Sequence, residues 1–344
     1  MADYISFQPS DFFNVKTWSG NSTDARSMTG VGFQPDWVWI KSTTAVESHT
    51  VWDSPRGVEK VLYTNANNAE ATVADGLQSF NADGYTIGTE GKVNSSGNDY
   101  VGFSWKMGTT TGLSGGTITP SAYSFNATQL QGICKYDGNS TTGASVPHGL
   151  GVKPDMIIIK KLSDTDSWWI YHKGLTAHKY IDLPGTSTPS TTSVFMNNTE
   201  PTSTLFYLGA SGNVNGGGDT YVAYAMASKR GYSKIDTYRG NGNSDGSFVY
   251  TGFRPAYLLL RNTDNTNDTP LMNSKVEGYN TRNDPLYANL ANADTQTDRV
   301  SFMSNGFKLN STSSQVNENT SMYIYAAFAE FPFVSSNSKP GTAR

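Results

Sequence analysis

The segment GVKPDMIIIK, residues 151–160, places a Gly-x-x-Pro turn directly before a continuous apolar run. The same pattern occurs as GFQPDWVWIK at residues 32–41 and as GFRPAYLLLR at residues 252–261. A short apolar run that is bounded by turn residues is typical of a fully buried strand, and a proline at the start of a strand removes no ladder hydrogen bond. The copies begin 119 and 101 residues apart, a spacing that is the size of a domain.

Two further landmarks recur with each copy. The first is an aromatic-x-Gly-Asn landmark, whose aromatic residue lies 14 or 15 residues before the glycine of each copy. It reads WSGN at residues 18–21, YDGN at 136–139 and YRGN at 238–241. A closing segment, which mixes large aromatic with small residues, begins at residues 99, 220 and 321. Asp83-Gly84 and Asn305-Gly306 are hairpin signals before the first and third closing segments, because both central residues of a type I′ turn need positive φ. The sequence therefore predicts one strand order, written three times.

The composition favours the same fold class. The 344 residues include 34 Gly, 19 Tyr, 16 Phe and 7 Trp, with only 16% charged residues. Aromatic and β-branched residues favour strands, and Gly and Asn serve tight turns. We expect an all-β protein of tandem β-sandwich or jelly-roll modules, with module 1 at residues 1–110, module 2 at 111–230 and module 3 at 231–344. A module of this size should bury a core of its own, so residues 121–230 should fold alone.

Charge and cysteine usage exclude several classes of protein. The net charge is −4 with neither sign clustered, so no basic face for nucleic acid is expected. The single cysteine, Cys134, excludes an internal disulfide framework. No apolar stretch is long enough to span a membrane, and residues 1–4 do not read as a signal peptide. A protein of this kind that acts outside a cell would need another route, such as release of a virus particle by lysis.

No catalytic motif is present, and the sequence predicts no catalytic residue, no metal site and no cofactor. His172 and His178 are six residues apart, which fits no zinc spacing, and His148 should bond loop carbonyl groups. Acidic residues in the loops after the Pro-initiated strands could supply oxygen ligands to Ca²⁺, although no complete calcium loop is visible; they are Asp164, Asp166, Asp264 and Asp268. A carboxylate pair for glycoside cleavage stays open as well, because such pairs meet in space rather than in sequence.

Aromatic residues that follow the Pro-initiated strands are the leading candidates for a site. They are Trp52 in module 1 and Trp168, Trp169 and Tyr171 in module 2, where His172 follows directly. One interpretation is a ligand-binding surface on which sugar rings or a partner protein stack, since aromatic residues dominate interface hot spots. The other interpretation is packing in the core of an all-β module.

The middle module also carries a resemblance. Its segments ICKYDGN (133–139), VPHGLGVKPDMIIIK (146–160) and WIYHKGL (169–175), with the closing YIYAAFAEFPF (323–333) of module 3, resemble modules of tailed-bacteriophage virion structural proteins. Such modules are common in phages of cyanobacteria and other aquatic bacteria, in tail-fibre or minor structural proteins. The resemblance implies a lectin-like or jelly-roll sandwich, and it carries no catalytic residues to transfer.

Three functional hypotheses follow. The first is a virion surface protein, a tail fibre or receptor-binding component, that assembles in the host cytoplasm and binds a host surface glycan or receptor through its loops, as a homo-oligomer. The second is a capsid decoration or cement protein, or a tail adaptor, which contacts other virion proteins. The third is a polysaccharide depolymerase. The first two need neither nucleic-acid contact nor membrane insertion.

Overall fold

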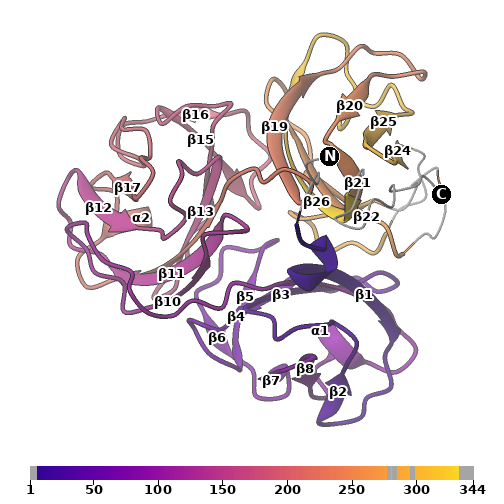
Figure 1. The fold of residues 1–344 in the computed structure, drawn as a ribbon, viewed down its shortest axis with the longest axis horizontal. Coiled ribbons are helices and arrows are strands. Elements are labelled where there is room, and N and C mark those ends of the chain that lie inside the picture. The colour runs from indigo at the N-terminus through magenta and orange to yellow at the C-terminus, as the bar shows by residue number, and fades with distance from the viewer. Residues whose placement is uncertain (1–5, 277–279, 281–284, 295–298, 333–344) are drawn as a thin grey trace.

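The computed structural model describes residues 6–276, 280, 285–294 and 299–332 (Figure 1). Their fold is all-β, as predicted: the only α-helices in these ranges are α1 (Gly91–Asn94) and α2 (Gly212–Asn215), accompanied by a 3-10 turn η1 (Pro9–Asp11). Neither helix is long enough to cross a membrane. The outer ends of modules 1 and 3, residues 1–5 and 333–344, lie outside the described residues.

Three large antiparallel sheets have corresponding strand orders. The first is β1 (Phe13–Ser19), β9 (Asp99–Trp105), β3 (Trp37–Ser42), β4 (Thr50–Asp53), β5 (Lys60–Tyr63) and β6 (Ala71–Thr72). The second is β10 (Ala122–Asn126), β11 (Gln131–Asp137), β18 (Thr220–Met226), β13 (Met156–Lys161), β14 (Trp168–His172), β15 (Lys179–Leu183) and β16 (Ser190–Thr191). The third is β19 (Ser233–Arg239), β26 (Met322–Pro332), β21 (Phe253–Asn262), β22 (Pro270–Asn273) and β23 (Leu286–Tyr287).

In each sheet the closing strand of the module lies between its first strand and its Pro-initiated strand. Pro35 and Pro154 lie two residues before β3 and β13, whereas Pro255 lies inside β21 at a shift in register. The second sheet has one additional edge strand, β10. The three prolines therefore mark corresponding central strands, with a small irregularity in the third.

A small sheet covers the outer face of each large sheet. These are β2 (Arg26–Met28) with β8 (Gly84–Ile87) and β7 (Leu77–Asn81), β12 (Ala144–Pro147) with β17 (Leu205–Leu208), and β20 (Phe248–Tyr250) with β25 (Gly306–Leu309) and β24 (Val300–Met303). Buried side chains from both layers form a separate apolar cluster in each of the three regions. Each region is thus a two-layer sandwich, which is the predicted architecture.

The inner faces of the three large sheets meet in a fourth apolar cluster at the centre (Figure 1). Trp37 of the first sheet stacks on Trp105 at 4.2 Å between ring centroids and lies 4.8 Å from Tyr224 of the second sheet. Trp105 in turn lies 5.5 Å from Tyr257 of the third sheet. The central strands are apolar on both faces because each face packs on a different layer. Each sandwich buries a core of its own, as expected, and the shared core is an additional cluster that was not predicted.

A repeated polar turn closes one end of each sandwich. A fully buried asparagine accepts a hydrogen bond from the backbone N–H of the Asn in the aromatic-x-Gly-Asn landmark: Asn94 from Asn21 at 3.1 Å, Asn215 from Asn139 at 2.9 Å and Asn317 from Asn241 at 2.9 Å. The preceding valine offers its carbonyl oxygen to the landmark aromatic side chain in all three copies. A tyrosine hydroxyl six residues after each asparagine braces the same turn.

The glycine of the landmark is required by close backbone packing against this turn. A Cβ atom would lie 2.0 Å from the Ser95 oxygen at Gly20, 2.2 Å from the Gly216 oxygen at Gly138 and 2.1 Å from the Glu318 oxygen at Gly240. No real Cβ atom tolerates such a contact with backbone, so any side chain there forces the strand away from the turn.

Because the inner face of its sheet is buried by the other two modules, module 2 should not be stable by itself. We expect residues 121–230 alone to lose near-ultraviolet circular dichroism, to bind a hydrophobic dye and to self-associate, since they expose Met156, Ile158, Trp168, Tyr224 and Met226. The whole chain should melt in one calorimetric transition. A monomeric fragment with a cooperative melt of its own would contradict a structural dependence on the shared core.

The Gly138→Ala substitution should lower the free energy of unfolding by about 2–4 kcal/mol, because the new methyl group meets a backbone oxygen that cannot move freely. Gly212→Ala in α2 is the matched control, since no atom lies within 4 Å of a Cβ built there. Denaturant titration of both variants measures the difference. Equal midpoints for the two variants would show that the close approach at residue 138 is unimportant.

Candidate functional site

The five aromatic and histidine side chains predicted as ligand-binding are all buried, with exposed fractions between 0% and 8%. Trp52 and Tyr171 occupy corresponding positions opposite Val38 and Ile157 in the strand register, and both belong to the core of their own sandwich. Trp169 stacks on Tyr180 with ring centroids 4.0 Å apart. This burial favours the second interpretation, core packing. Ligand binding by these residues stays a prediction.

Trp168 and His172 belong to the contacts between sheets. The indole Nε1 of Trp168 donates to the backbone carbonyl oxygen of Tyr63 in the first sheet at 2.8 Å. The imidazole Nδ1 of His172 accepts from the backbone N–H of Gly174 at 3.1 Å. Both side chains help to position neighbouring segments, which is a structural role.

A buried cation ends the central strand of each large sheet. Lys41, Lys160 and Arg261 occupy corresponding positions and are at most 2% exposed. Each binds carbonyl oxygens rather than a carboxylate: Lys41 binds those of Ser42 and Ala45, Lys160 those of Asn67 and Asp166, and Arg261 those of Gly185 and Ser187. Burial lowers the pKa of Lys41 and of Lys160 to about 8.

These contacts run around the molecule in one direction. The segment after β5 covers Lys160 of the second sheet, and the segment after β15 covers Arg261 of the third. The segment after β23 then returns to the first sheet, where the Thr64 hydroxyl donates to the Ala288 oxygen at 2.6 Å and the Asp294 N–H donates to the Thr43 oxygen at 3.0 Å. Three sandwiches therefore form a closed ring with cyclic contacts.

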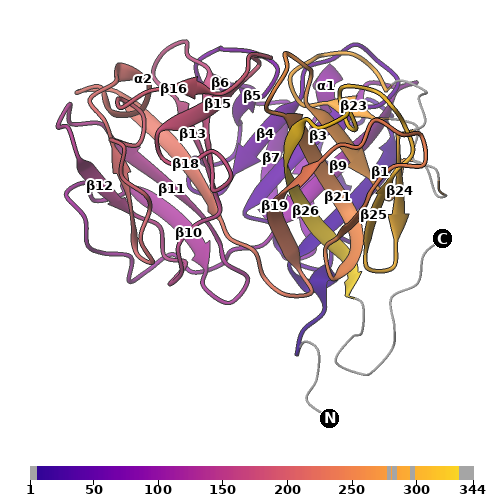
Figure 2. The same cartoon turned by 90° about the horizontal axis from the view of Figure 1, so that it is seen from above.

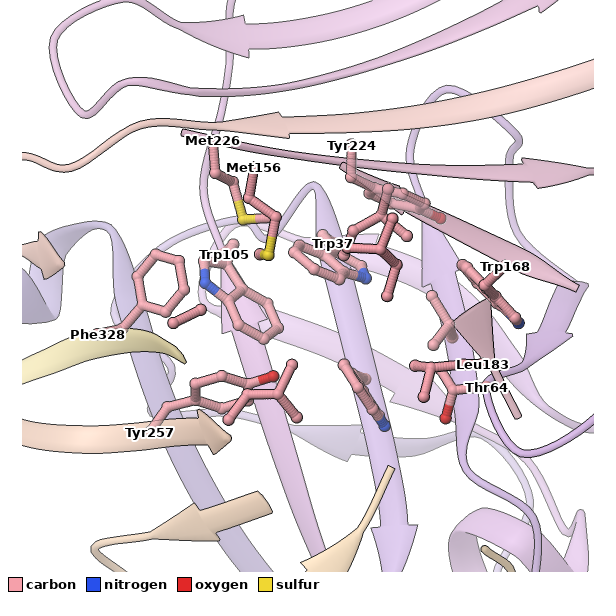
Figure 3. A pocket seen from close by; sticks show the side chains of 16 residues that line it. Trp37, Thr64, Trp105, Met156, Trp168, Leu183, Tyr224, Met226, Tyr257 and Phe328 are labelled. Atoms are coloured by element: carbon pink, nitrogen blue, oxygen red, sulfur yellow. The ribbon is translucent and has the colours of Figure 1, made fainter. Parts of the chain in front are cut away.

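The cavity at the centre of this ring is too small for a ligand. Figure 3 shows its lining of aromatic and aliphatic side chains from all three sheets, and its volume is about 30 Å³. Small-molecule sites are on the order of 300–1,000 Å³, and a water molecule in a cavity needs two to four polar partners. This cavity is a packing gap in the shared core.

The acidic loop residues considered for Ca²⁺ are engaged one by one by protein donors. Asp166 accepts from Ser167 and Trp169, and burial raises its pKa. Asp268 accepts from the side chains of Asn289 and Gln315. Within the described residues no group of three or more His, Cys, Asp or Glu side chains is arranged to hold a metal.

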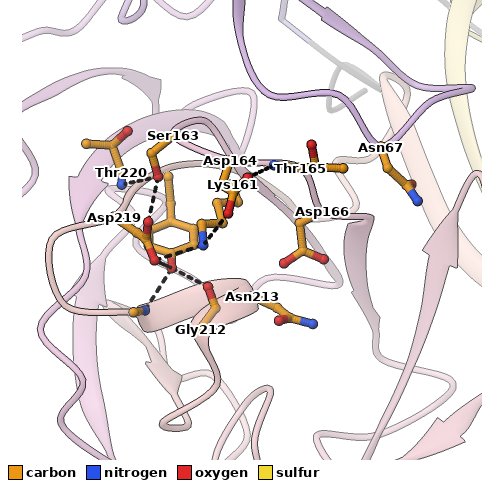
Figure 4. Close-up of polar contacts among 12 residues, drawn as sticks. Asn67, Lys161, Ser163, Asp164, Thr165, Asp166, Gly212, Asn213, Asp219 and Thr220 are labelled. Carbon is orange, nitrogen blue, oxygen red and sulfur yellow. Dashed lines mark hydrogen bonds and ion pairs between the residues drawn. The ribbon is translucent and has the colours of Figure 1, made fainter.

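One polar cluster near α2 joins a serine, a lysine and a carboxylate (Figure 4). Lys161 Nζ lies 2.8 Å from Asp219 Oδ2, and the Ser163 hydroxyl donates to Asp219 Oδ1 at 2.9 Å. The hydrogen bond from Lys161 lowers the pKa of Asp219, so this carboxylate stays ionised and is a poor proton acceptor at neutral pH. Ser163 also accepts from the Thr220 N–H. The cluster braces a turn and does not activate Ser163 as a nucleophile.

Of the open hollows between neighbouring sandwiches, two are lined by corresponding strand ends. The 3/1 hollow, of about 390 Å³, is lined by Thr17, Trp18, Ser19, Thr43, Thr44, Asp99 and Tyr100 of the first sandwich and by Lys275, Val276 and Asp294 of the third. The 2/3 hollow, of about 470 Å³, is lined by Arg239, Thr263, Asp264 and Met322 of the third sandwich and by Gly174, Leu175, Lys179, Thr188 and Pro189 of the second. Strand pairing places Ser19 and Arg239, and likewise Asp99 and Met322, at corresponding positions. The hollows are therefore related sites with different side chains.

An exposed aromatic pair lies on the edge strand β20. Phe248 is 47% and Tyr250 58% exposed, and no other aromatic residue in the described part of the chain is comparably exposed. The corresponding positions on β12 of the second sandwich hold Ser145 and Pro147. The pair is thus a feature of the third sandwich alone.

Neither hollow was predicted from the sequence, and nor was the exposed aromatic pair. The repeated turn does have a detectable sequence signal, which is a Val-Asn pair whose valine lies seven residues before a tyrosine. The pairs are at residues 93–94, 214–215 and 316–317. No comparable signal marks the hollows, because each combines residues from two sandwiches. His148 behaves as predicted, with Nε2 3.3 Å from the Thr202 oxygen.

A family model described as Domain of unknown function (DUF7483) matches residues 8–332. No curated protein and no solved structure matches the chain.

The buried histidines predict loss of stability in mild acid. Burial lowers the pKa of His148 and of His172 to about 4 and that of His49 well below 6.5. The unfolded chain therefore binds more protons between about pH 4 and 6.5, so the free energy of unfolding falls as the pH falls through that window. His172→Asn, which installs the residue that Asn273 provides at the corresponding position of β22, should flatten the pH dependence by close to one proton.

The exposed His178 provides the matched control as His178→Asn. Urea titrations at several pH values between 4 and 7 measure the slopes. The same slope for wild type and for His172→Asn would contradict a buried, neutral His172.

Proposed function

The chain belongs to the DUF7483 family, and we propose that it is a binding protein of a bacteriophage virion that attaches to the surface of the host cell. The end of the molecule that carries α1, α2 and the repeated polar turns is called the loop end. The observation that carries the proposal is the pair of polar hollows at this end, each open to solvent and held between two sandwiches.

The position of the loop end, opposite the start and the end of the described chain, supports this role. In Figure 2 α1 and α2 lie at one end of the body, and the indigo start of the described chain and the yellow tip of β26 lie at the opposite end. A protein joined to a larger particle through its chain ends would therefore present the loop end outward. Loops on a rigid β scaffold are suited to binding because they vary without disturbing the core.

Binding rather than catalysis is favoured by the state of the polar groups. The buried carboxylate of the central region is held by nearby donors, since Asp53 binds Arg56 at 2.5 Å and the Tyr224 hydroxyl at 2.6 Å. Ser163 lacks an adjacent free base, as described above. A virion carries many copies of its surface proteins, and weak sites on many copies, or on a homo-oligomer, add to a strong attachment.

The exposed aromatic pair favours a second candidate, a contact with another virion protein, as in a decoration protein or a tail adaptor. Aromatic residues are enriched in protein interfaces, and an edge strand offers unpaired backbone groups to a partner. Phe248 and Tyr250 combine both features. Attachment to the particle and attachment to the host can coexist, because the two surfaces are distinct.

The proposal predicts saturable binding of the fluorescently labelled whole chain to cells of the bacterium that the encoding phage infects. Non-host bacteria of the same surface charge are the control. Binding to host cells should survive the double substitution Phe248→Ser and Tyr250→Pro, which installs the residues of the second sandwich. The same variant should no longer bind phage particles that lack the protein.

Binding to such particles together with no binding to host cells would overturn host attachment in favour of the second candidate. Release of reducing sugar from host envelopes would overturn both and point to a depolymerase.

A further inference from the structure

We propose that the 2/3 hollow binds a carboxylated sugar residue of an anionic polysaccharide. This inference rests on the proposed host-binding function and names the class of ligand. It follows from the side chains that distinguish this hollow from its counterpart at the 3/1 junction.

The charge of the two hollows differs in sign. The 3/1 hollow has one cation, Lys275, with two carboxylates, Asp99 and Asp294. The 2/3 hollow has two cations, Arg239 and Lys179, with one carboxylate, Asp264. The side chain of Asp264 is engaged within the third sandwich, where Oδ2 accepts from the backbone N–H of Met322 at the start of β26 at 2.9 Å. The 2/3 hollow therefore has a net attraction for an anion.

Its two cations come from different sandwiches. Arg239 ends β19 and Lys179 begins β15, so the hollow has a positive group on both walls. Arg239 Nη1 donates to the backbone carbonyl oxygen of Thr320 at 2.9 Å, which fixes the direction of the guanidinium. A planar guanidinium matches a carboxylate in a two-bond geometry, and the lysine supplies a second charge.

The rest of the lining suits a sugar. Thr188 offers a hydroxyl group for hydrogen bonds, and Leu175, Pro189 and Met322 offer apolar surface to the C–H face of a pyranose ring. Met322 replaces the Asp99 of the 3/1 hollow, so this apolar contact is specific to the 2/3 hollow. A volume of about 470 Å³ lies within the usual range of ligand sites, and the hollow is open, so a polymer can pass through it.

The two walls are fixed relative to each other. Arg261 of the third sandwich binds the Gly185 and Ser187 oxygens of the second at 3.0 and 2.8 Å, directly before Thr188 and Pro189 of the hollow. The segment that carries these two lining residues is therefore anchored to the opposite wall before any ligand arrives. Such preorganisation reduces the entropy that binding must overcome.

The experiment is titration calorimetry of the whole chain with trigalacturonate, with the neutral trisaccharide maltotriose as the ligand control. We expect binding of trigalacturonate only, weakened by added salt. Arg239→Ser, which installs the residue of the first sandwich at this position, should weaken it at least about tenfold, as expected for loss of a charge-assisted pair.

Lys179→Gln should weaken binding in the same direction. Its matched control is Lys60→Gln, which removes the same charge at the corresponding position of β5, outside the hollow. Circular dichroism melts check that all variants fold.

No heat with trigalacturonate, or equal affinities for wild type and Arg239→Ser, would overturn the inference. Host-cell binding that persists in Arg239→Ser would overturn it while host attachment itself survives. Trigalacturonate binding that depends on Arg239, in a chain that ignores host cells, would instead uphold the site and refute the proposed function.

Discussion

The burial of three apolar sheet faces against one another is the constraint on which the rest of the molecule depends. Each central strand carries large side chains on both faces, and a two-layer sandwich covers only one of them. Trp105, Tyr224 and Tyr257 meet at the centre because each removes from water a surface that its own sandwich leaves open. At roughly 25 cal/mol per Å² of buried apolar surface, the burial of several aromatic rings stabilises the packing of the three sandwiches against one another.

This arrangement determines where polar groups are placed. The end of each central strand is covered by a segment of the neighbouring sandwich, so the cation at that position loses water and must find carbonyl oxygens. Lys160 obtains one of its two carbonyl oxygens from the adjacent sandwich, and Arg261 obtains both, so the hydrogen bonds that offset burial also link neighbouring sandwiches. The open hollows form beside these links, where two rounded bodies touch without filling the space between them.

The strands and their repetition were predictable because local rules govern them. The Gly-x-x-Pro turns, the aromatic-x-Gly-Asn landmark and the alternating closing segments all mark elements that the structure contains. The sequence could not distinguish an aromatic residue that faces a neighbouring sandwich from one that faces solvent, since the strand pattern is the same in both cases. Trp52 and Trp168 were candidates for a binding surface for that reason, and both are buried. The hollows could not be predicted because their geometry depends on how separate segments dock.

Comparison among the three copies within the chain separates structural from functional positions. Gly20, Gly138 and Gly240 are identical because the same backbone contact forbids a side chain in each copy. At the neighbouring strand position the copies hold Ser19, Asp137 and Arg239, although the local backbone pairing is the same. A position that the fold leaves unconstrained but that differs in charge among otherwise matching sites is where binding specificity can change without loss of stability. Arg239 is such a position, and it lies in the wall of the 2/3 hollow.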